Sequence, residues 1–248
     1  MRWTSTLKNS SLELPRPLDL VILGSPGVGK GTYGALIGKW LEILHLSSGD
    51  LIRAEIASQS KLGLEVEPQI NRGELLSDEL VMQLVKSRLK KPDASNGTLF
   101  DGFPRRGSQV PMLDNVRSIK AAIMLTLRED VLYEKAINRR VCSTCKRSYN
   151  TAHIMEGSMR MPAILPKVGM LCDSCGGTLE HRSDDQPETV KARLELAKTL
   201  NKEVSDAYQQ THRLFEFQLT SGVADMWPKL KDYIKSSVIT RRNEPRDL

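Results

Sequence analysis

A glycine-rich string at a strand–helix junction constrains this chain more than any other feature. It reads Gly24-Ser25-Pro26-Gly27-Val28-Gly29-Lys30-Gly31-Thr32, directly after an apolar run and directly before a helical pattern. Glycine lets the backbone wrap closely around phosphate oxygens, a helix N-terminus attracts anions, and Lys30 adds a positive charge for the β- and γ-phosphates. The string therefore predicts a phosphate-binding loop, in preference to a turn that binds nothing.

Short apolar runs alternate with helical patterns along the rest of the chain. This alternation predicts an α/β fold, here a three-layer P-loop domain with a five-stranded parallel sheet. The expected strands are Leu18–Leu23, Ile43–Ser47, Thr98–Asp101, Ala121–Leu127 and Leu214–Leu219. The expected helices include Lys30–Leu41, Asp78–Lys90, Glu129–Arg139 and Glu188–His212.

The last of these helices has the clearest start signal. Asp185-Gln186-Pro187-Glu188 predicts an acidic N-cap followed by a proline in the first turn. Val190, Leu194, Ala197, Val204, Tyr208 and Thr211 then recur at helical spacing. One face of this long helix is therefore expected to pack on the sheet.

Two regions interrupt the alternation and predict insertions on a single core. A chain of 248 residues suits one domain that carries sizeable insertions. Residues 48–76 read as an all-helical excursion, and residues 141–181 are rich in Cys, Gly, Pro and Met. The core then covers residues 18–240, between an N-terminal extension at 1–17 and a polar tail at 241–248.

The charge and the N-terminal residues leave partners and location open. A net charge of +6 fits either a polyanionic partner or a mildly basic, solvated surface, and the second is favoured. No apolar run approaches the length that crosses a bilayer. Arg2, Lys8 and Arg16, among several Ser and Thr, faintly resemble a transit peptide, whereas Glu13 argues against one. A mitochondrial or plastid location and a cytoplasmic one both remain open.

All four cysteines lie in two paired knuckles, Cys142-x-x-Cys145 and Cys172-x-x-Cys175. This spacing favours a tetrahedral Cys₄ zinc site, with disulfides and reduced thiols as the alternatives. Four thiolates fill the coordination sphere of Zn²⁺, so the metal is expected to be structural. The long Met- and Pro-rich segment between the pairs is interpreted as a tolerated loop insertion rather than a contact surface.

The phosphate-loop string has the form G-x-P-G-x-G-K-G-T, which is found in adenylate kinases and related nucleoside monophosphate kinases. The chain resembles this family from about Leu18 to Ile234. Leu99-Phe100-Asp101-Gly102-Phe103-Pro104-Arg105-Arg106-Gly107-Ser108-Gln109 matches the family's most diagnostic string. The lengthened Cys₄ lid is similar to that of plant organellar adenylate kinases. The resemblance implies a helical monophosphate-binding insertion at 48–76 and a β-rich zinc lid at 141–181.

The resemblance also implies an acceptor site and a Mg²⁺ site. Asp101 resembles the carboxylate that holds Mg²⁺ through water, and Gln109 resembles the residue that reads the adenine edge. An amide pairs with a donor and an acceptor together, so Gln109 favours AMP as acceptor. The implied acceptor-site residues are Ser48, Arg53, Glu74, Leu75, Leu76, Gly102, Phe103, Arg105, Gln109, Arg182 and Arg193.

The implied donor site departs from the family at one position. Its residues are Gly27, Val28, Gly29, Lys30, Gly31, Thr32, Lys135, Arg139, Ser148, Tyr149 and Val223. Lys135 stands where the family usually has an arginine that stacks on the donor base, and lysine has no planar guanidinium. The choice between ATP and GTP as donor is therefore left open.

The reaction implied by the resemblance is reversible transfer of the γ-phosphoryl group from Mg-bound ATP to AMP, giving two ADP. Its implied catalytic residues are Lys30, Asp101, Arg105, Arg139, Arg182 and Arg193. The expected partners are nucleotides alone, with no nucleic acid and no membrane, and the expected state is a monomer. Lid opening is hypothesised to limit turnover.

Three alternatives remain at this point. The first is GTP:AMP or UMP/CMP transfer within the same family. The second is a non-enzymatic module whose zinc knuckles bind nucleic acid, which is disfavoured because only 5% of the residues are aromatic. The third is an inactive relative, which would have lost Lys30, Asp101 or the arginines.

Overall fold

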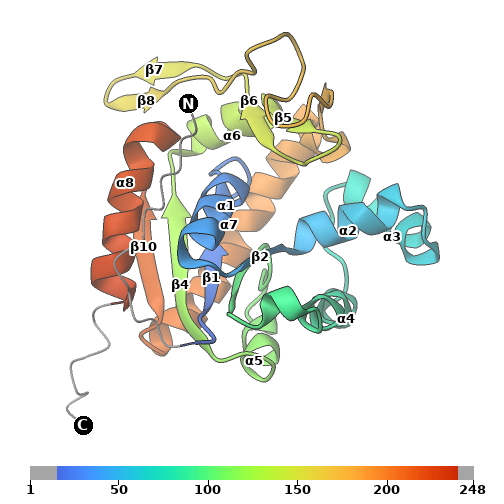
Figure 1. Cartoon of the computed structure of the whole chain (residues 1–248), viewed down its shortest axis with the longest axis vertical. Coiled ribbons are helices and arrows are strands. Elements are labelled where there is room, and N and C mark those ends of the chain that lie inside the picture. The colour runs from blue at the N-terminus through green and yellow to red at the C-terminus, as the bar shows by residue number, and fades with distance from the viewer. Residues whose placement is uncertain (1–15, 240–248) are drawn as a thin grey trace, which may run out of the picture.

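Five parallel strands form the central sheet, in the order β10-β4-β1-β3-β2 (Figure 1). The computed structural model describes residues 16–239 of the chain. The strands are β1 (Asp19–Leu23), β2 (Leu44–Ser47), β3 (Thr98–Asp101), β4 (Ile119–Thr126) and β10 (Leu214–Gln218). They coincide with the five expected strands to within about two residues at each end, and the predicted α/β class is confirmed.

Helices cover both faces of the sheet, so the domain has three layers, with the sheet in the middle. On one face, α1 (Lys30–Leu41) and α8 (Val223–Tyr233) pack against Leu20 and Ile22 of β1. On the other, α4 (Asp78–Leu89), α5 (Gln109–Asp114) and the second half of α7 (Pro187–Gln210) pack against Val21 and Leu23. Successive residues of a strand point to opposite faces, so one apolar run supplies both cores.

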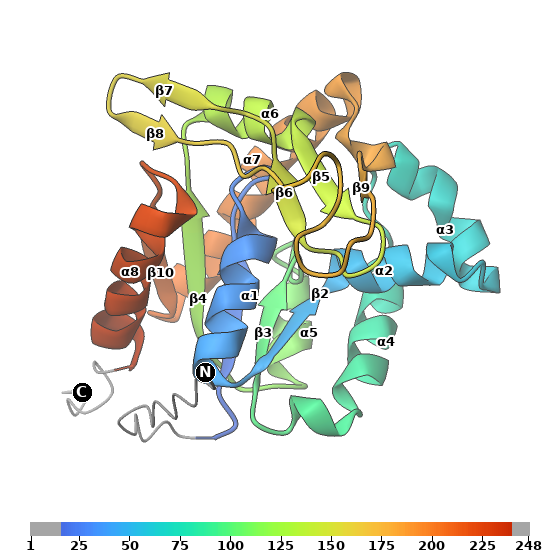
Figure 2. The ribbon, with the colours of Figure 1, turned by 45° about the horizontal axis from the view of Figure 1, so that its top comes forward.

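The helical insertion leaves the sheet directly after β2 and projects to one side (Figures 1 and 2). It contains α2 (Ser48–Ala57) and α3 (Lys61–Asn71), as the sequence predicts. Ser47 caps α2 by accepting the Asp50 N–H at 3.2 Å. A Cβ at Gly63 would lie 2.1 Å from the carbonyl oxygen of Glu55, so this glycine permits the close approach of α3 to α2.

The lid is built from short antiparallel strands above α6 (Glu129–Ile137). Strands β5 (Arg139–Cys142), β6 (Ser148–Asn150) and β9 (Leu179–Glu180) form one sheet, in the order β6-β5-β9. Strands β7 (Ile154–Glu156) and β8 (Met159–Met161) form a separate hairpin. Arg139 belongs to β5 and not to the preceding helix, so the prediction of a helix through Arg139 is wrong by two residues.

The start of α7 differs from its predicted cap. Its N-cap is Gln186, whose side chain makes no capping hydrogen bond, and Pro187 takes the first helical position. Asp185 instead lies in the short helix η2 (Ser183–Asp185), where it is fully buried and binds arginines of the site. Of the predicted inward face, Val190, Leu194, Val204 and Tyr208 are buried, Ala197 is half-buried and Thr211 is exposed. The 3₁₀ helix η1 (Pro92–Ala94) and the π-helical turn η3 (Ile234–Ile239) complete the elements.

The predicted extension and tail fall largely outside the described residues. Residues 1–15 and 240–248 lie outside them. Arg2 and Lys8, on which the resemblance to a transit peptide partly depends, are therefore not described. Arg16 is described, and its guanidinium donates to the carbonyl of Leu41 at 2.8 Å, at the C-terminal end of α1. Among residues 16–239, no helix is both long enough and apolar enough to cross a membrane.

Candidate active site

The predicted phosphate loop connects β1 to α1 at the carboxyl edge of the sheet. Its glycines are needed: Gly27 has φ 87°, and a Cβ there would lie 2.3 Å from the carbonyl oxygen of Leu132. Gly29, with φ 102°, caps the N-terminus of α1. The Lys30 Nζ folds back over the loop and donates to the carbonyls of Gly24 at 2.6 Å and Ser25 at 3.2 Å.

Lys30 lies in a strongly electropositive position. Enclosure in the cleft lowers the pKa of Lys30 to about 8, although the nearby Asp101 opposes this change. Arg105, Arg139 and Arg193 add to the lowering of the Lys30 pKa. An anion bound at the loop would relieve this repulsion, as expected for a phosphate site.

Asp101 faces the phosphate loop from the end of β3. The carboxyl is 6% exposed, and its Oδ2 lies 4.0 Å from where a Cβ of Gly31 would be. His45 Nε2 lies 3.1 Å from the same oxygen. Sequence reasoning missed His45. In the structure His45 fills the space beside Gly34, where a Cβ would meet its Nε2 at 2.3 Å.

Two predicted arginines are held by a pair of buried aspartates on η2. Arg139 donates to both carboxylate oxygens of Asp185, from Nε at 2.8 Å and from Nη2 at 2.5 Å. Arg193 on α7 lies 2.9 Å from Asp184 and 3.3 Å from Asp185. Sequence reasoning missed this role of the aspartates and read Asp185 as a helix cap. Bidentate pairs of this kind fix the plane of the guanidinium.

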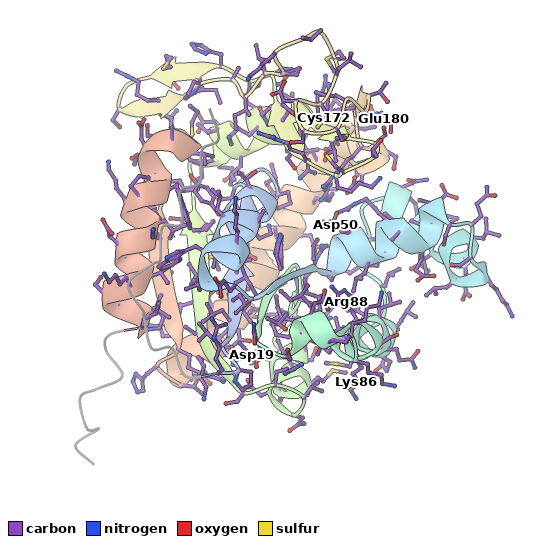
Figure 3. The ribbon with its side chains drawn as sticks, viewed as in Figure 1. Asp19, Asp50, Lys86, Arg88, Cys172 and Glu180 are labelled. Atoms are coloured by element: carbon purple, nitrogen blue, oxygen red, sulfur yellow. The ribbon has the colours of Figure 1, made fainter. Side chains whose placement is uncertain are left out.

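Arg182 has no such anchor. Its Nε is buried without a hydrogen-bond partner among residues 16–239, and its nearest carboxylate oxygen, on Asp50 of α2, is 3.9 Å away. Burial, together with the charges of Arg139 and Arg53, lowers the pKa of Arg182 to about 9. Figure 3 places Asp50 between the helical insertion and the core. An unpaired, buried N–H beside other cations indicates a place for an anion.

The predicted acceptor residues line a pocket of about 60 Å³ beside this cluster. It is lined by Ser48, Arg53, Glu74, Leu75, Leu76, Gly102, Phe103, Arg105, Gln109 and Arg193, which is the predicted set apart from Arg182. Ser48 Oγ donates to the carbonyl of Gly102 at 2.7 Å. Gln109 is 2% exposed, accepts the Arg105 N–H at 2.6 Å and donates to Asp78 at 2.7 Å. Asp78, which sequence reasoning missed, therefore orients the Gln109 amide.

A larger cleft of about 1150 Å³ joins the phosphate loop to the lid. It brings together all the predicted donor residues: Gly27, Val28, Gly29, Lys30, Gly31, Thr32, Lys135, Arg139, Ser148, Tyr149 and Val223. It also contains Leu196, Leu200 and Asn201 of α7, which were not predicted. Asn201 donates to Ser25 Oγ at 3.2 Å and so ties α7 to the phosphate loop.

The four cysteines of the lid converge. Their sulfurs all lie within 4.8 Å of one another, and the pairs Cys142–Cys175 and Cys145–Cys172 are each 3.5 Å apart. Sulfurs bound tetrahedrally to Zn²⁺ lie about 3.8 Å apart, so the donor set fits this ion. Gly177 leaves room for the cluster, because a Cβ there would lie 3.0 Å from Cys142 Sγ.

Tyr149 belongs to the cysteine cluster as well as to the cleft wall. Its hydroxyl lies 3.5 Å from Cys172 Sγ and accepts the Asp173 N–H at 2.8 Å. The polar end of Tyr149 is therefore directed to the cysteines, while the residue contributes to the lining of the donor cleft.

The fold and the site together define a class of protein. A phosphate loop at the carboxyl edge of a parallel sheet, faced by Arg139, Arg182 and Arg193, defines a P-loop phosphotransferase.

Comparison with known proteins identifies the family. The adenylate kinase family model matches residues 22–213. The chain is 38% identical over 218 residues to "Probable adenylate kinase 1, chloroplastic" of Oryza sativa subsp. japonica, covering 87% of this chain and 74% of that protein. It is 38% identical over 203 residues to "Adenylate kinase" of Thermosipho melanesiensis, covering 80% and 90% respectively. The chain belongs to the adenylate kinase family, whose members are phosphotransferases acting on nucleotides.

Proposed function

We propose that this protein catalyses the reversible transfer of the γ-phosphoryl group of ATP to AMP, giving two ADP. The observation that carries the proposal is the group of cations between the two pockets. Lys30 reaches this group from the phosphate loop, Arg139 and Arg182 from the lid, and Arg193 from α7. Such a group can compensate charge on a phosphoryl group that passes from one pocket to the other.

The chain's own residues supply positioning and charge. Lys30 and Arg139 stabilise the transferred phosphoryl, and Arg182 and Arg193 complete the clamp. Arg53 and Arg105 orient the acceptor phosphate. Mg²⁺, bound with ATP, supplies further positive charge at the donor phosphates. Asp101 suits its water shell because the carboxylate faces Gly31 of the loop.

AMP is the proposed acceptor, and Gln109 is the residue that selects it. Asp78 accepts from the Gln109 Nε2, which fixes the orientation of the amide at the edge of the acceptor pocket. An oriented amide distinguishes purine from pyrimidine edges, which favours AMP over UMP and CMP. Lys135 leaves GTP as the alternative donor, because its side chain cannot stack as a guanidinium does.

A structural Zn²⁺ bound by Cys142, Cys145, Cys172 and Cys175 is part of the proposal. With all four positions taken by thiolates, the metal holds the lid together and takes no part in phosphoryl transfer. We further propose a monomer that binds neither nucleic acid nor membrane. Because relatives from Oryza sativa and Arabidopsis thaliana carry "chloroplastic" in their names, a plastid location is favoured over mitochondria and cytoplasm.

The experiment that tests the reaction is a coupled assay of ADP formation over a panel of donors and acceptors with Mg²⁺. We expect the highest kcat/KM for ATP with AMP. Lys30→Met should lower that kcat/KM by about 10²–10³-fold, as loss of a group that stabilises transition-state charge does. The control Lys202→Met, exposed on α7, should leave it unchanged. Higher kcat/KM with GTP would assign a changed donor pocket to Lys135, and no transfer to any monophosphate would refute the proposal.

A further inference from the structure

The lengthened lid segment contains a hairpin that leaves the lid and lies on the core. Figure 1 shows β7 and β8 above α8, on the far side of the molecule from the helical insertion. Part of the segment interpreted from the sequence as a tolerated loop insertion is packed on the core: Met159 and Met161 are each only 4% exposed and belong to the core cluster that contains Leu219 and Met226.

The hairpin joins the loop between β10 and α8 through its backbone. The Arg160 N–H donates to the carbonyl of Thr220 at 3.1 Å, and the Arg160 carbonyl accepts the Gly222 N–H at 2.7 Å. These two bonds make a parallel bridge between Arg160 and Ser221. The loop 219–223 thus gains a partner strand that comes from the lid insertion.

The contact between the hairpin segment and loop 219–223 is also tightly packed. A Cβ at Gly222 would lie 2.9 Å from Pro162 Cδ, so a glycine is needed opposite this proline. Gly222 has φ −63°, a conformation open to any residue, and its requirement is therefore one of space alone. At the other end of the hairpin, Glu156 pairs with Arg128 at 2.7 Å.

Loop 219–223 also forms a wall of the donor cleft. Leu219, Ser221, Gly222 and Val223 line it, together with Pro162 from the segment that follows the hairpin. Under the proposed function the donor phosphates would bind at the phosphate loop, which lines the same cleft. Loop 219–223 lines this cleft and not the acceptor pocket, so it would contact the rest of the donor nucleotide.

We propose that the β7–β8 hairpin is a positioning element that holds loop 219–223 against the donor base and so sets the affinity for the donor nucleotide. This inference rests on the proposed function, because it takes the large cleft as the donor site. It assigns to the lid insertion a role in the binding of ATP that does not depend on lid closure.

A proline substitution at Arg160 tests the contact with loop 219–223 without breaking the pairing of β7 with β8. Partners across an antiparallel pair alternate between bonded and non-bonded positions. The Arg160 N–H and carbonyl are directed to the loop, so Arg160→Pro removes the bond to Thr220 and leaves the cross-strand bonds of the hairpin. Met155 faces Arg160 across the pair and is 49% exposed, which makes Met155→Pro the matched control.

The measurement is KM for ATP and KM for AMP in the coupled assay, on variants whose melting temperatures are recorded. We expect Arg160→Pro to raise KM for ATP about fivefold or more, because it removes the N–H that bonds to Thr220, with KM for AMP unchanged. Arg160→Pro also removes the guanidinium bonds to the carbonyls of Gly157 and Met159, so Arg160→Ala, which keeps the N–H, is a second control and should match the wild type. Met155→Pro should match the wild type. Hydrogen exchange at the Gly222 amide should be faster in Arg160→Pro alone.

A second pair of variants tests the packing of Gly222 against Pro162. Gly222→Ala should raise KM for ATP, because the new methyl displaces the loop from Pro162. Gly222→Ala combined with Pro162→Ala should raise KM for ATP less than Gly222→Ala does on its own, because the ring that would clash is gone. Pro162→Ala alone is measured beside it, because Pro162 also lines the cleft. Equal KM values for ATP in Arg160→Pro and Met155→Pro, or equal rises in both KM values, would overturn the inference. An inactive wild type would instead refute the proposed function.

Discussion

Asp19 is a buried carboxyl at the end of the sheet away from the lid (Figure 3). It is 1% exposed, and its Oδ1 has no hydrogen-bond partner among residues 16–239. Burial raises its pKa, although Arg117, the Thr98 amide and Lys120 oppose the rise. A raised pKa means that the native protein holds this proton more tightly than the unfolded chain, so the ionised carboxylate lowers stability above the unfolded pKa.

We therefore expect Asp19→Asn to raise the melting temperature at pH 7. A gain of about 1 kcal/mol corresponds to about 2–4 °C for a chain of this length. The gain should shrink as the pH falls through the titration range of Asp19 and vanish below the unfolded pKa, near 3.8. Thermal unfolding followed by circular dichroism at several pH values measures it. Asp232→Asn, exposed on α8, is the control that should leave the melting temperature at pH 7 unchanged. A lower melting temperature for Asp19→Asn at pH 7 would contradict the assignment.

Single site residues were predictable where a motif fixes the backbone, and their partners were not. Lys30, Asp101 and Arg105 follow from local strings, because each lies in or next to a loop at a strand end. Asp78, which orients Gln109, lies 31 positions away in the chain. His45 meets Asp101 across two neighbouring strands. Such pairs depend on strand order, which the sequence pattern of one chain does not contain.

Among the elements, the lid sheet has little apolar core of its own. Its buried cluster contains only Cys142, Tyr149, Cys172 and Leu179, with Ile164 packed against them. A module with so small an apolar core generally needs a further source of stability, such as a structural metal or a disulfide.

We expect Cys172→Ser to abolish the binding of one Zn²⁺ per chain, measured by elemental analysis of the purified protein. Losing a structural metal should lower the melting temperature by about 10 °C. Chelation of the wild type should have the same effect, and added Zn²⁺ should reverse it. Ser143→Ala, between the first two ligands, is the control that should retain the metal. A wild type that contains no zinc when purified with zinc present would contradict the assignment.

The elements show where periodicity is reliable and where it is ambiguous. The buried strand β1, the largely buried strand β4 and the 24-residue helix α7 were predicted to within two residues, because a long apolar pattern fits only one type of secondary structure. The six-residue helix α5 and the helix α8, which has Pro228 inside it, were missed. The sequence pattern placed Arg139 in a helix. The strand that begins at Arg139 forms through its pairing with β6 and β9, which a pattern confined to neighbouring residues does not reveal.

In the whole molecule, the lid is tied to the core at more points than its two chain connections. Asn150 donates to the Lys135 carbonyl at 2.7 Å, and the Thr151 N–H donates to the Asn138 carbonyl at 3.0 Å. The docked hairpin is a further tie. If the lid opens while the hairpin stays docked, the chain on either side of the hairpin has to bend.

We expect this opening to limit turnover. Rapid-quench kinetics with ATP and AMP should show a burst of ADP in the first turnover, followed by a slower steady state, because chemistry precedes the slow step. Increasing solvent viscosity with sucrose should lower kcat and leave the burst rate unchanged. Absence of a burst, or a first turnover as slow as the steady state, would place the limit at chemistry instead.

The docking of the hairpin on loop 219–223 also has a consequence for how the chain is completed during synthesis. The chain emerges from its N-terminus, and the hairpin is made about 60 residues before the loop that it pairs with. Until β10 and the start of α8 have followed, Met159 and Met161 lack the part of their core that Leu219 and Met226 supply. A nascent or truncated chain that ends before residue 219 therefore displays two methionines on an unpaired strand edge, which is the kind of surface that chaperones bind and proteases find.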